Sequence, residues 1–302
     1  MELLQLKYFK ALAETEHLTR TADRLFVSAP ALSCAIKRLE SELGTTLFDR
    51  VGRRMHLNEC GSIYLQCVNQ VFSALNNAER QITDIGISRN PTISICVTSP
   101  IIWQNLFCAF MKSFPNITLS HYYVNIEPTL VEDMEIKYDY LLTPPTDLKN
   151  NKLHSNILYS DDIPMLIVNK SHRFANRDKI KLSEVKDEPF IALTKGLSSR
   201  KFFDELFAIA GIEPKIILEC DYSMRQEMIL SGNGIALSTA RARKSNLMPD
   251  VRFIEVIDPH FRRSQALFWH SNRFQTSTSL LFREFAIEYY NDDSNAITSI
   301  NS

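Results

Sequence analysis

Residues 19–39 read TRTADRLFVSAPALSCAIKRL, and this stretch decides the fold of the N-terminal region. Thr19 is a predicted N-cap for a short helix over residues 21–25. Ser28 is a predicted N-cap for a longer one, with Pro30 in its first turn, where a missing N–H does no harm. A further helix is expected upstream, from apolar residues at helical spacing: Leu3, Leu6, Phe9, Leu12 and Ala13.

The helix that follows Ser28 has two contrasting faces. Leu32, Ile36 and Leu39 recur at the helical period, so we expect them in a core. The exposed face carries small, polar and basic residues: Ala29, Ser33, Cys34, Lys37 and Arg38. Two short helices joined by a tight turn are typical of a helix-turn-helix, although an ordinary small helical bundle gives the same pattern.

A basic hairpin is predicted next in the chain. Residues 47–50 and 53–57 read as two short strands around Val51-Gly52, with Arg50, Arg53 and Arg54 at the tip. Arginines on a protruding wing suit phosphates or a minor groove, whereas the alternative is a solvated loop. The net charge of the chain is −1, so any nucleic-acid surface must be local.

Residues 1–61 resemble the DNA-binding domain of the LysR-type transcriptional regulators. The shared motifs occur in order at family spacing: Leu-Lys-Tyr-Phe at 6–9, the motifs at 19–25, 27–33 and 36–40, Leu-Gly at 43–44, and Leu-Phe-Asp-Arg at 47–50. The resemblance extends more weakly to about residue 290. Face, wing and resemblance together predict these DNA-binding residues: Thr19, Arg20, Ser28, Ala29, Pro30, Ser33, Lys37, Arg38, Arg50, Arg53 and Arg54.

The chain departs from the family pattern at several positions. Ala29 stands where the family commonly has Gln, so a bidentate amide contact to a base is absent there. Cys34 replaces an Arg or another polar residue. Glu-His-Leu at 16–18 replaces the usual Gly-Ser-Phe. Asn58 stands where Thr is common and can still cap the next helix.

Residues 59–88 form one long predicted helix. Its apolar residues follow at alternating spacings of four and three: Tyr64, Val68, Val71, Leu75, Ala78, Ile82 and Ile85. That seam, about three heptads long, predicts a coiled coil with a second copy, in agreement with the family, whose linker helices pair. The alternative is packing on the chain's own C-terminal domain. A homodimer, or a tetramer built as a dimer of dimers, would bind an interrupted inverted repeat of double-stranded DNA.

From residue 91 onward, short apolar runs alternate with amphipathic segments, as in α/β domains. Strands are expected at 93–97, 117–124, 138–143, 165–169, 190–193, 216–220, 235–238 and 266–269. Helices are expected at 103–114, 130–136, 201–210, 224–230 and 279–290. The resemblance implies two lobes like those of periplasmic binding proteins: lobe I at about 91–161 and 269–290, lobe II at about 162–268.

The expected fold is therefore an N-terminal all-α winged helix-turn-helix (1–58), a long linker helix (59–88) and a two-lobed α/β effector-binding domain (91–302). Ligands of open α/β sheets lie beyond the carboxyl ends of strands. The effector-binding residues predicted there are Thr98, Ser99, Pro100, Asn125, Thr143, Thr194, Ser198 and Ser199. Hydroxyls and helix N-termini favour an anionic small molecule, although each residue taken singly can be a cap. A counter-charge can come from Lys195, Arg200 or Arg225.

Other functional classes have less support in the sequence. There is no GxSxG, HExxH, P-loop or GxGxxG motif and no metal-spaced histidine pair, so we expect no catalysis, metal or cofactor. The six scattered cysteines suit a reducing compartment and leave a thiol-based redox-sensing regulator of the same fold as the alternative: Cys34, Cys60, Cys67, Cys96, Cys108 and Cys220. A structural nucleoid protein is a further alternative. Without a signal peptide or membrane span, a cytoplasmic location is expected, with RNA polymerase as a partner if the protein is an activator.

Overall fold

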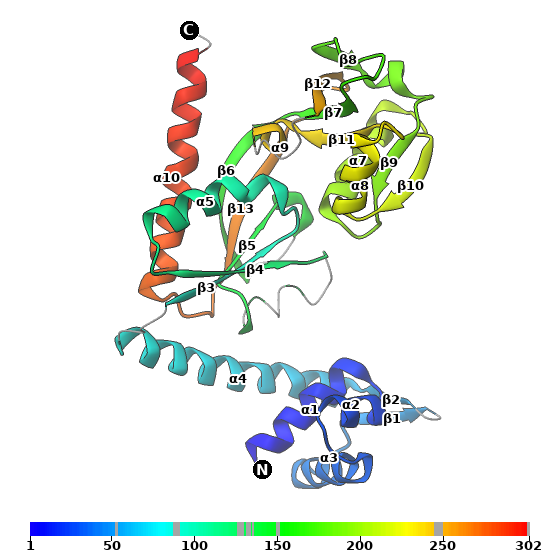
Figure 1. The fold of residues 1–302 in the computed structure, drawn as a ribbon. Helices are drawn as coiled ribbons and strands as arrows, with labels where there is room; N and C mark the ends of the chain where they lie inside the picture. Colours follow the sequence, from blue (N-terminus) through cyan, green and yellow to red (C-terminus); the bar gives the residue numbers. More distant parts are fainter. Residues whose placement is uncertain are drawn as a thin grey trace. The chain divides into compact units, whose positions relative to one another are not determined.

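The computed structural model describes residues 1–51, 54–86, 91–125, 130, 134, 136–148, 152–244 and 250–300. For residues 50, 51, 54 and 292–300 it describes the backbone alone. The chain divides into two compact units, Met1–Arg80 and Gln81–Ser302 (Figure 1). No helix within the described ranges combines the length and the apolar character needed to cross a membrane.

The first unit is a small helical domain with a β-hairpin. Its elements are α1 (Leu3–Thr15), α2 (Leu18–Arg24), α3 (Ala29–Leu43), β1 (Phe48–Val51), β2 (Arg54–Leu57) and the first part of α4 (Glu59–Ile85). Leu6, Phe9 and Leu12 are buried as predicted, whereas Leu3 is 52% exposed. The predicted inner face of α3 is confirmed, because Leu32, Ile36 and Leu39 lie in the same core.

Local hydrogen bonds set where the helices begin. The predicted Thr19 cap is wrong: α2 begins at Leu18, and the ring Nδ1 of His17 accepts from the amide of Arg20 at 3.3 Å. Thr19 therefore lies inside the first turn. Ser28 caps α3 as predicted, because its Oγ accepts from the amide of Ala31 at 3.3 Å.

Helix α4 starts against the base of the hairpin. The side-chain oxygen of Asn58 accepts from the amide of Gly61 at 2.8 Å, which confirms Asn58 as a cap. A Cβ at Gly61 would come within 2.2 Å of the carbonyl oxygen of Leu47, so only glycine lets the helix approach this closely.

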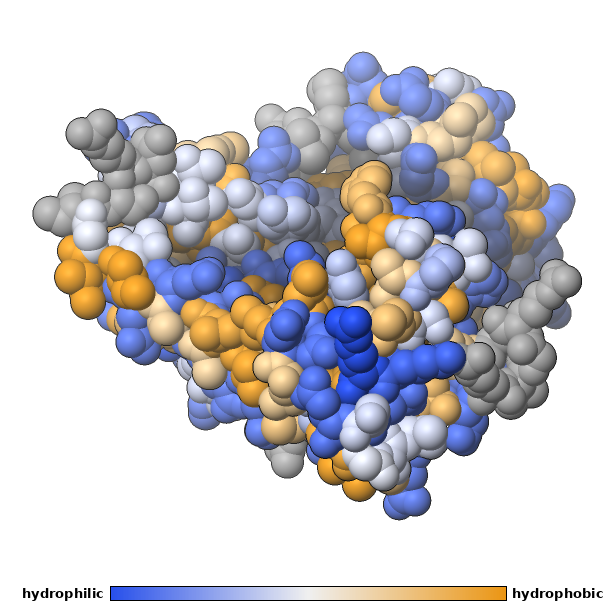
Figure 2. Space-filling view, turned by 90° about the horizontal axis from the view of Figure 1, so that it is seen from below, coloured by the Kyte–Doolittle hydropathy of each residue, from blue (hydrophilic) through white to orange (hydrophobic). Residues whose placement is uncertain are grey.

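The apolar seam of α4 divides into two parts. Tyr64 and Val68 pack into the core of the first unit, and Val68 is almost fully buried. Farther along, Val71 is 38%, Leu75 43% and Ile82 70% exposed. Figure 2 shows hydrophobic residues gathered in patches among hydrophilic ones on one face of the molecule.

Lobe I is built on a five-stranded sheet with the order β4-β3-β5-β13-β6 (Figure 1). Its strands are β3 (Thr92–Val97), β4 (Thr118–Tyr123), β5 (Tyr140–Thr143), β6 (Leu153–Asp162) and β13 (Arg263–His270). Residues 263–268, which were predicted in lobe II, thus pair with the strands of lobe I. Strand β3 is parallel to β4 and β5, whereas β13 is antiparallel to β5 and β6. Helices α5 (Gln104–Ser113) and α10 (Ser277–Ile300) meet through Phe110 and Phe282, whose ring centroids are 5.0 Å apart.

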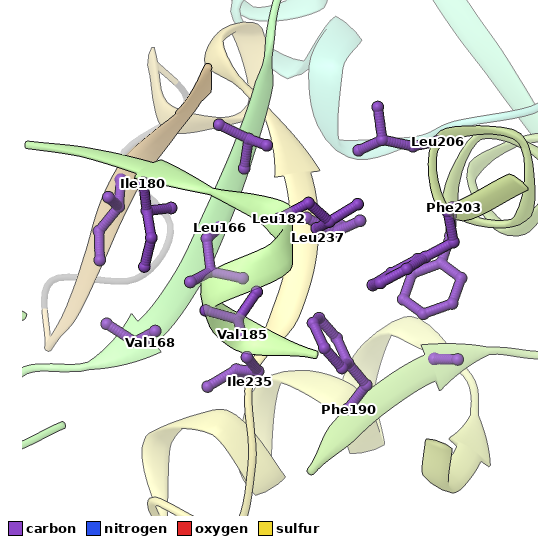
Figure 3. Close-up of a cluster of buried hydrophobic side chains, with 14 of the residues drawn as sticks. Leu166, Val168, Ile180, Leu182, Val185, Phe190, Phe203, Leu206, Ile235 and Leu237 are labelled. Carbon is purple, nitrogen blue, oxygen red and sulfur yellow. The ribbon is translucent and has the colours of Figure 1, made fainter. Parts of the chain in front are cut away.

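Lobe II contains a four-stranded sheet and a two-stranded one. The first has the order β11-β7-β12-β8, from β7 (Pro164–Asn169), β8 (Lys179–Lys181), β11 (Ala236–Thr239) and β12 (Val251–Asp258). The second pairs β9 (Phe190–Leu193) in parallel with β10 (Ile216–Cys220). Helices α7 (Ser198–Ala210), α8 (Tyr222–Leu230) and α9 (Ala240–Lys244) complete the lobe. Figure 3 shows Phe190 from β9 facing Phe203 from α7 inside its core.

The predicted fold class is confirmed, and each of the eight strands predicted in the C-terminal region lies within a few residues of an observed one. Strands β6, β8 and β12 were not predicted, because polar residues interrupt their apolar pattern. Most of the helix predicted at 130–136 lies outside the described residues. Helix α7 begins at Ser198, three residues before the predicted start at 201.

Candidate nucleic-acid and effector sites

The outer face of α3 presents most of the predicted DNA-binding residues to solvent. Lys37 and Arg38 are exposed, as are Ser28 and Pro30 at the start of the helix. Ser33 and Ala29 are half-buried beside them, and Thr19 and Arg20 are exposed on the first turn of α2. One surface of two capped helices thus carries hydroxyl, amide and cationic groups, which can contact phosphates and base edges.

Electrostatics favour a polyanion at this surface. Glu14 pairs with Arg24 at 3.2 Å, and Glu42 pairs with the N-terminal amine at 2.6 Å. Among the described residues, no acidic side chain lies within ion-pair distance of Arg20, Lys37 or Arg38. The acids of the domain are therefore partly neutralised by its own cations, while these three cations remain available to a partner.

The predicted wing is present as an antiparallel hairpin, with Phe48 opposite Leu57 and Val51 opposite Arg54. Arg53 lies outside the described residues, and for Arg50 and Arg54 only the backbone is described. Their contacts with DNA therefore stay predictions.

Glu16 fastens the wing to the helix-turn-helix, a role that the sequence analysis missed. Its two carboxylate oxygens contact the Leu57 amide and His56 Nδ1, each at 2.9 Å, and its carbonyl accepts from the Met55 amide at 3.1 Å. Its φ of 51° lies in the left-handed region, where glycine is favoured. The sequence signal was the loss of the family's usual glycine at this position.

Between the lobes, the structure brings together several predicted effector-binding residues. Thr98 and Thr143, which are fully buried at the ends of β3 and β5, share a hydrogen bond of 2.7 Å between their hydroxyls. The hydroxyls of Ser99 in lobe I and Ser199 in lobe II are 2.9 Å apart.

Three other predicted effector-binding residues lie outside these contacts. Thr194 and Asn125 are exposed, and Pro100 is half-buried. Of the eight predicted residues, Ser99 and Ser199 line the cavity described below, and the other six do not.

Asp147 is a second residue that the sequence analysis missed. Ser198 donates to its Oδ2 at 2.6 Å, and Lys201 Nζ lies 3.0 Å from its Oδ1. Arg263 in turn donates to the hydroxyl and the carbonyl oxygen of Ser198, at 2.6 and 3.0 Å. A carboxylate from lobe I therefore sits at the N-terminus of α7 in lobe II, beside two cations.

A small cavity lies against these contacts. Its polar lining comes from Ser99, Ser199, Tyr222, Ser238, Thr239, Arg225 and Arg263. Its apolar lining comes from Ile101, Ile102, Phe202, Leu237 and Ala242. Burial lowers the pKa of both arginines. A pocket with apolar walls and a few convergent polar groups is the usual form of a small-molecule site.

The three residues predicted to supply a counter-charge differ in their surroundings. Lys195 is exposed. Arg200 is buried but pairs with Asp204 and Glu219, each at 2.8 Å. Arg225 alone of the three lines the cavity.

The redox alternative stays a prediction. All six are free: Cys96 and Cys220 are buried, and the other four are exposed. Burial raises the pKa of the Cys220 thiol, which lowers its reactive thiolate fraction.

Comparison with known proteins identifies two matching family models. "Bacterial regulatory helix-turn-helix protein, lysR family" matches residues 3–62, and "LysR substrate binding domain" matches residues 89–291. The uncharacterized HTH-type transcriptional regulator YybE of Bacillus subtilis (strain 168) is 28% identical over 299 residues, 97% of this chain and 100% of YybE. The transcriptional dual regulator GltC of the same organism is 26% identical, over 96% of this chain and 98% of GltC.

A solved structure shows the same fold. Full-length CbnR complexed with its target DNA aligns with a TM-score of 0.60 at 19% identity, covering 96% of this chain and 100% of CbnR.

Proposed function

The chain belongs to the LysR family of bacterial transcriptional regulators, and from that premise we propose how its residues share the work of DNA binding and effector sensing. It is a sequence-specific DNA-binding regulator with an effector-binding domain, in a family of regulators rather than enzymes. We assign DNA binding to 1–58, dimerisation to 59–88 and effector binding to 91–302.

Helix α3 enters the major groove, and the wing follows the adjacent backbone. The observation that carries this assignment is the exposed face of α3, where Lys37 and Arg38 have no acidic partner among the described residues. Lys37, Arg38 and Ser33 contact the groove and its phosphates, Thr19 and Arg20 a neighbouring phosphate, and the wing arginines the minor groove. The relative CbnR has been solved with its target DNA.

The functional unit is a homodimer, which assembles further into a tetramer. Val71, Leu75 and Ile82 are the exposed part of the α4 seam and form its centre. Tyr64 and Val68 already support the DNA-binding domain and contribute less to pairing. Two-fold symmetry then matches an interrupted inverted repeat in the operator. The protein acts in the cytoplasm, where that DNA is, and contacts RNA polymerase if it activates transcription.

The effector binds in the cavity between the lobes. Ser99 and Ser199 approach it from opposite lobes, so occupancy alters how the lobes are held together. A ligand can shift that equilibrium only by its difference in affinity for the two arrangements.

Footprinting on chromosomal fragments selected by the full-length protein tests the assignment. Two protected half-sites are expected, one or more helical turns apart, on the same face of the duplex. Arg38→Ala should weaken binding and reduce the salt slope by about 0.9 if it contacts one phosphate. The matched control is Arg252→Ala, an exposed arginine of lobe II. An unchanged slope and footprint for Arg38→Ala would contradict the placement of α3.

A further inference from the structure

Arg225 carries a buried guanidinium without a carboxylate partner among the described residues. Arg225 is 5% exposed, and its Nη1 donates to the carbonyl oxygen of Leu237 at 3.3 Å. Its Nε has no hydrogen-bond partner. An unpaired charge taken out of water destabilises the fold, so its presence at a cavity points to a ligand that completes it.

The other cations near the cavity have carboxylates of the chain nearby. Asp147, whose side chain is 2% exposed, contacts Lys201 directly and lies close enough to Arg263 to stabilise its charge. Arg200 has its own two carboxylates. Arg225 is therefore the cavity-lining arginine without a carboxylate nearby among the described residues, and a negative charge on a ligand matches it.

The walls of the cavity define the rest of the ligand. Ile101 and Ile102 from lobe I and Phe202 and Leu237 from lobe II provide apolar surface. The cavity is small, so only a compact molecule suits it.

Tyr222 explains how the chain tolerates Arg225 before a ligand binds. The guanidinium carbon lies 5.0 Å from the centre of the Tyr222 ring, whose π-face partly compensates its charge. The Tyr222 hydroxyl donates to Ser199 Oγ at 2.6 Å, and its ring meets Tyr123 of lobe I at 5.9 Å. Contacts between the lobes thus hold the covering ring in place.

We propose that the effector is a compact monocarboxylic acid with an apolar body, and that Arg225 anchors its carboxylate. The proposal rests on the effector-binding function above and names the chemistry of that site. A planar carboxylate matches the donor edge of a guanidinium and replaces the Tyr222 ring as its counterpart. Tyr222 contacts Tyr123 of lobe I and bonds to Ser199, the residue that Ser99 of lobe I also bonds to, so displacement of this ring links occupancy to the contact between the lobes.

Thermal melting of the full-length protein with defined probes tests the proposal. The probes are isobutyrate and benzoate, their neutral amides isobutyramide and benzamide, the cation benzylamine and the dianion phthalate. At least one monocarboxylate should raise the melting temperature of the wild type, whereas its amide and the amine should not. Calorimetric titration of that carboxylate should show at least about tenfold weaker binding to Arg225→Met, and partial recovery in Arg225→Lys.

A control separates anchoring from folding. Arg252→Met removes another arginine that donates to a backbone carbonyl, that of Ala175, and should leave carboxylate affinity unchanged. Without a ligand, Arg225→Met should melt no lower than the wild type, because it removes an uncompensated buried charge. A structural arginine would give a lower melting temperature in this variant.

Three outcomes would overturn the proposal. Equal stabilisation by an amide or by benzylamine would exclude the monoanion while leaving an effector site in place. Unchanged carboxylate affinity in Arg225→Met would exclude this anchor. Failure of both monocarboxylates to stabilise the wild type would exclude the ligand class. The footprint described above tests DNA recognition independently of all three.

Discussion

Replacing Glu16 should loosen the wing, and the choice of replacement separates two opposing effects. The carboxylate of Glu16 accepts from the Leu57 amide and contacts His56, each at 2.9 Å, while its own backbone has a φ of 51°. Glu16→Ala removes the carboxylate and keeps the unfavourable backbone. Glu16→Gly removes the carboxylate and relieves the backbone as well.

The magnitudes follow from these contacts. A hydrogen bond to a charged acceptor contributes about 1.5–3 kcal/mol, and a half-exposed pair such as Glu16–His56 adds about 0–1 kcal/mol. We therefore expect Glu16→Ala to destabilise the wing by about 2–3 kcal/mol. A left-handed backbone costs about 1–2 kcal/mol for residues other than glycine, and the freedom of glycine in the unfolded chain offsets part of that. Glu16→Gly should thus be about 1 kcal/mol less destabilised.

Amide hydrogen exchange of peptides covering residues 47–58 measures this directly. Tryptophan fluorescence does not, because Trp103 and Trp269 both lie in the second unit. A loss of about 2 kcal/mol should speed exchange of the Leu57 amide roughly 30-fold in Glu16→Ala. Glu14→Ala, at a half-exposed pair with Arg24, is the matched control and should change little. Unchanged exchange in Glu16→Ala would contradict the role of the carboxylate in holding the wing. Faster exchange in Glu16→Gly than in Glu16→Ala would contradict the cost assigned to the left-handed backbone.

Three further predictions concern other parts of the molecule. Leu75→Glu places like charges in the centre of the proposed dimer seam and should abolish linker-mediated pairing while the second unit stays folded; an undisturbed oligomer by sedimentation would count against the coiled coil. Phe26 is 96% exposed with a φ of 56°, so Phe26→Gly should raise the stability of the first unit by up to about 1 kcal/mol in circular-dichroism melting, and a lowered melting point would show an unrecognised contact. Burial raises the pKa of Asp162 to about 6, so the folded chain binds a proton more tightly than the unfolded chain, and this contribution to stability is lost as pH rises from about 4 through 6. Asp162→Asn should therefore gain up to about 3 kcal/mol in urea unfolding at pH 8 and lose that advantage near pH 4; a gain independent of pH would contradict the assignment.

Most of the DNA-binding domain could be predicted from sequence patterns that span only a few residues. The inward face of α3 follows from its helical period, and the Ser28 and Asn58 caps depend on residues only three positions away. The Thr19 cap failed because His17, two residues earlier, supplies an acceptor that propensity alone ranks lower. Where a helix begins is decided by such single hydrogen bonds, so its exact start is harder to predict than its existence.

The effector cavity depends on contacts that are distant in sequence. Ser198 lies 51 residues from Asp147 and 65 from Arg263, and no local pattern relates them. Arg200 and Arg225 are both buried arginines of lobe II. One is neutralised by Glu219 of a neighbouring strand and the other is not, a difference that only the tertiary structure shows.

Operator affinity, measured with and without a stabilising monocarboxylate in the wild type and in Arg225→Met, shows whether the cavity controls DNA binding. The operator is the fragment selected by the protein itself, at one fixed salt concentration. We expect the carboxylate to change the affinity or the footprint of the wild type, while Arg225→Met binds the operator equally well without ligand and does not respond to the carboxylate. An operator affinity and footprint that stay the same in the wild type at saturating carboxylate would contradict the coupling of this cavity to DNA binding.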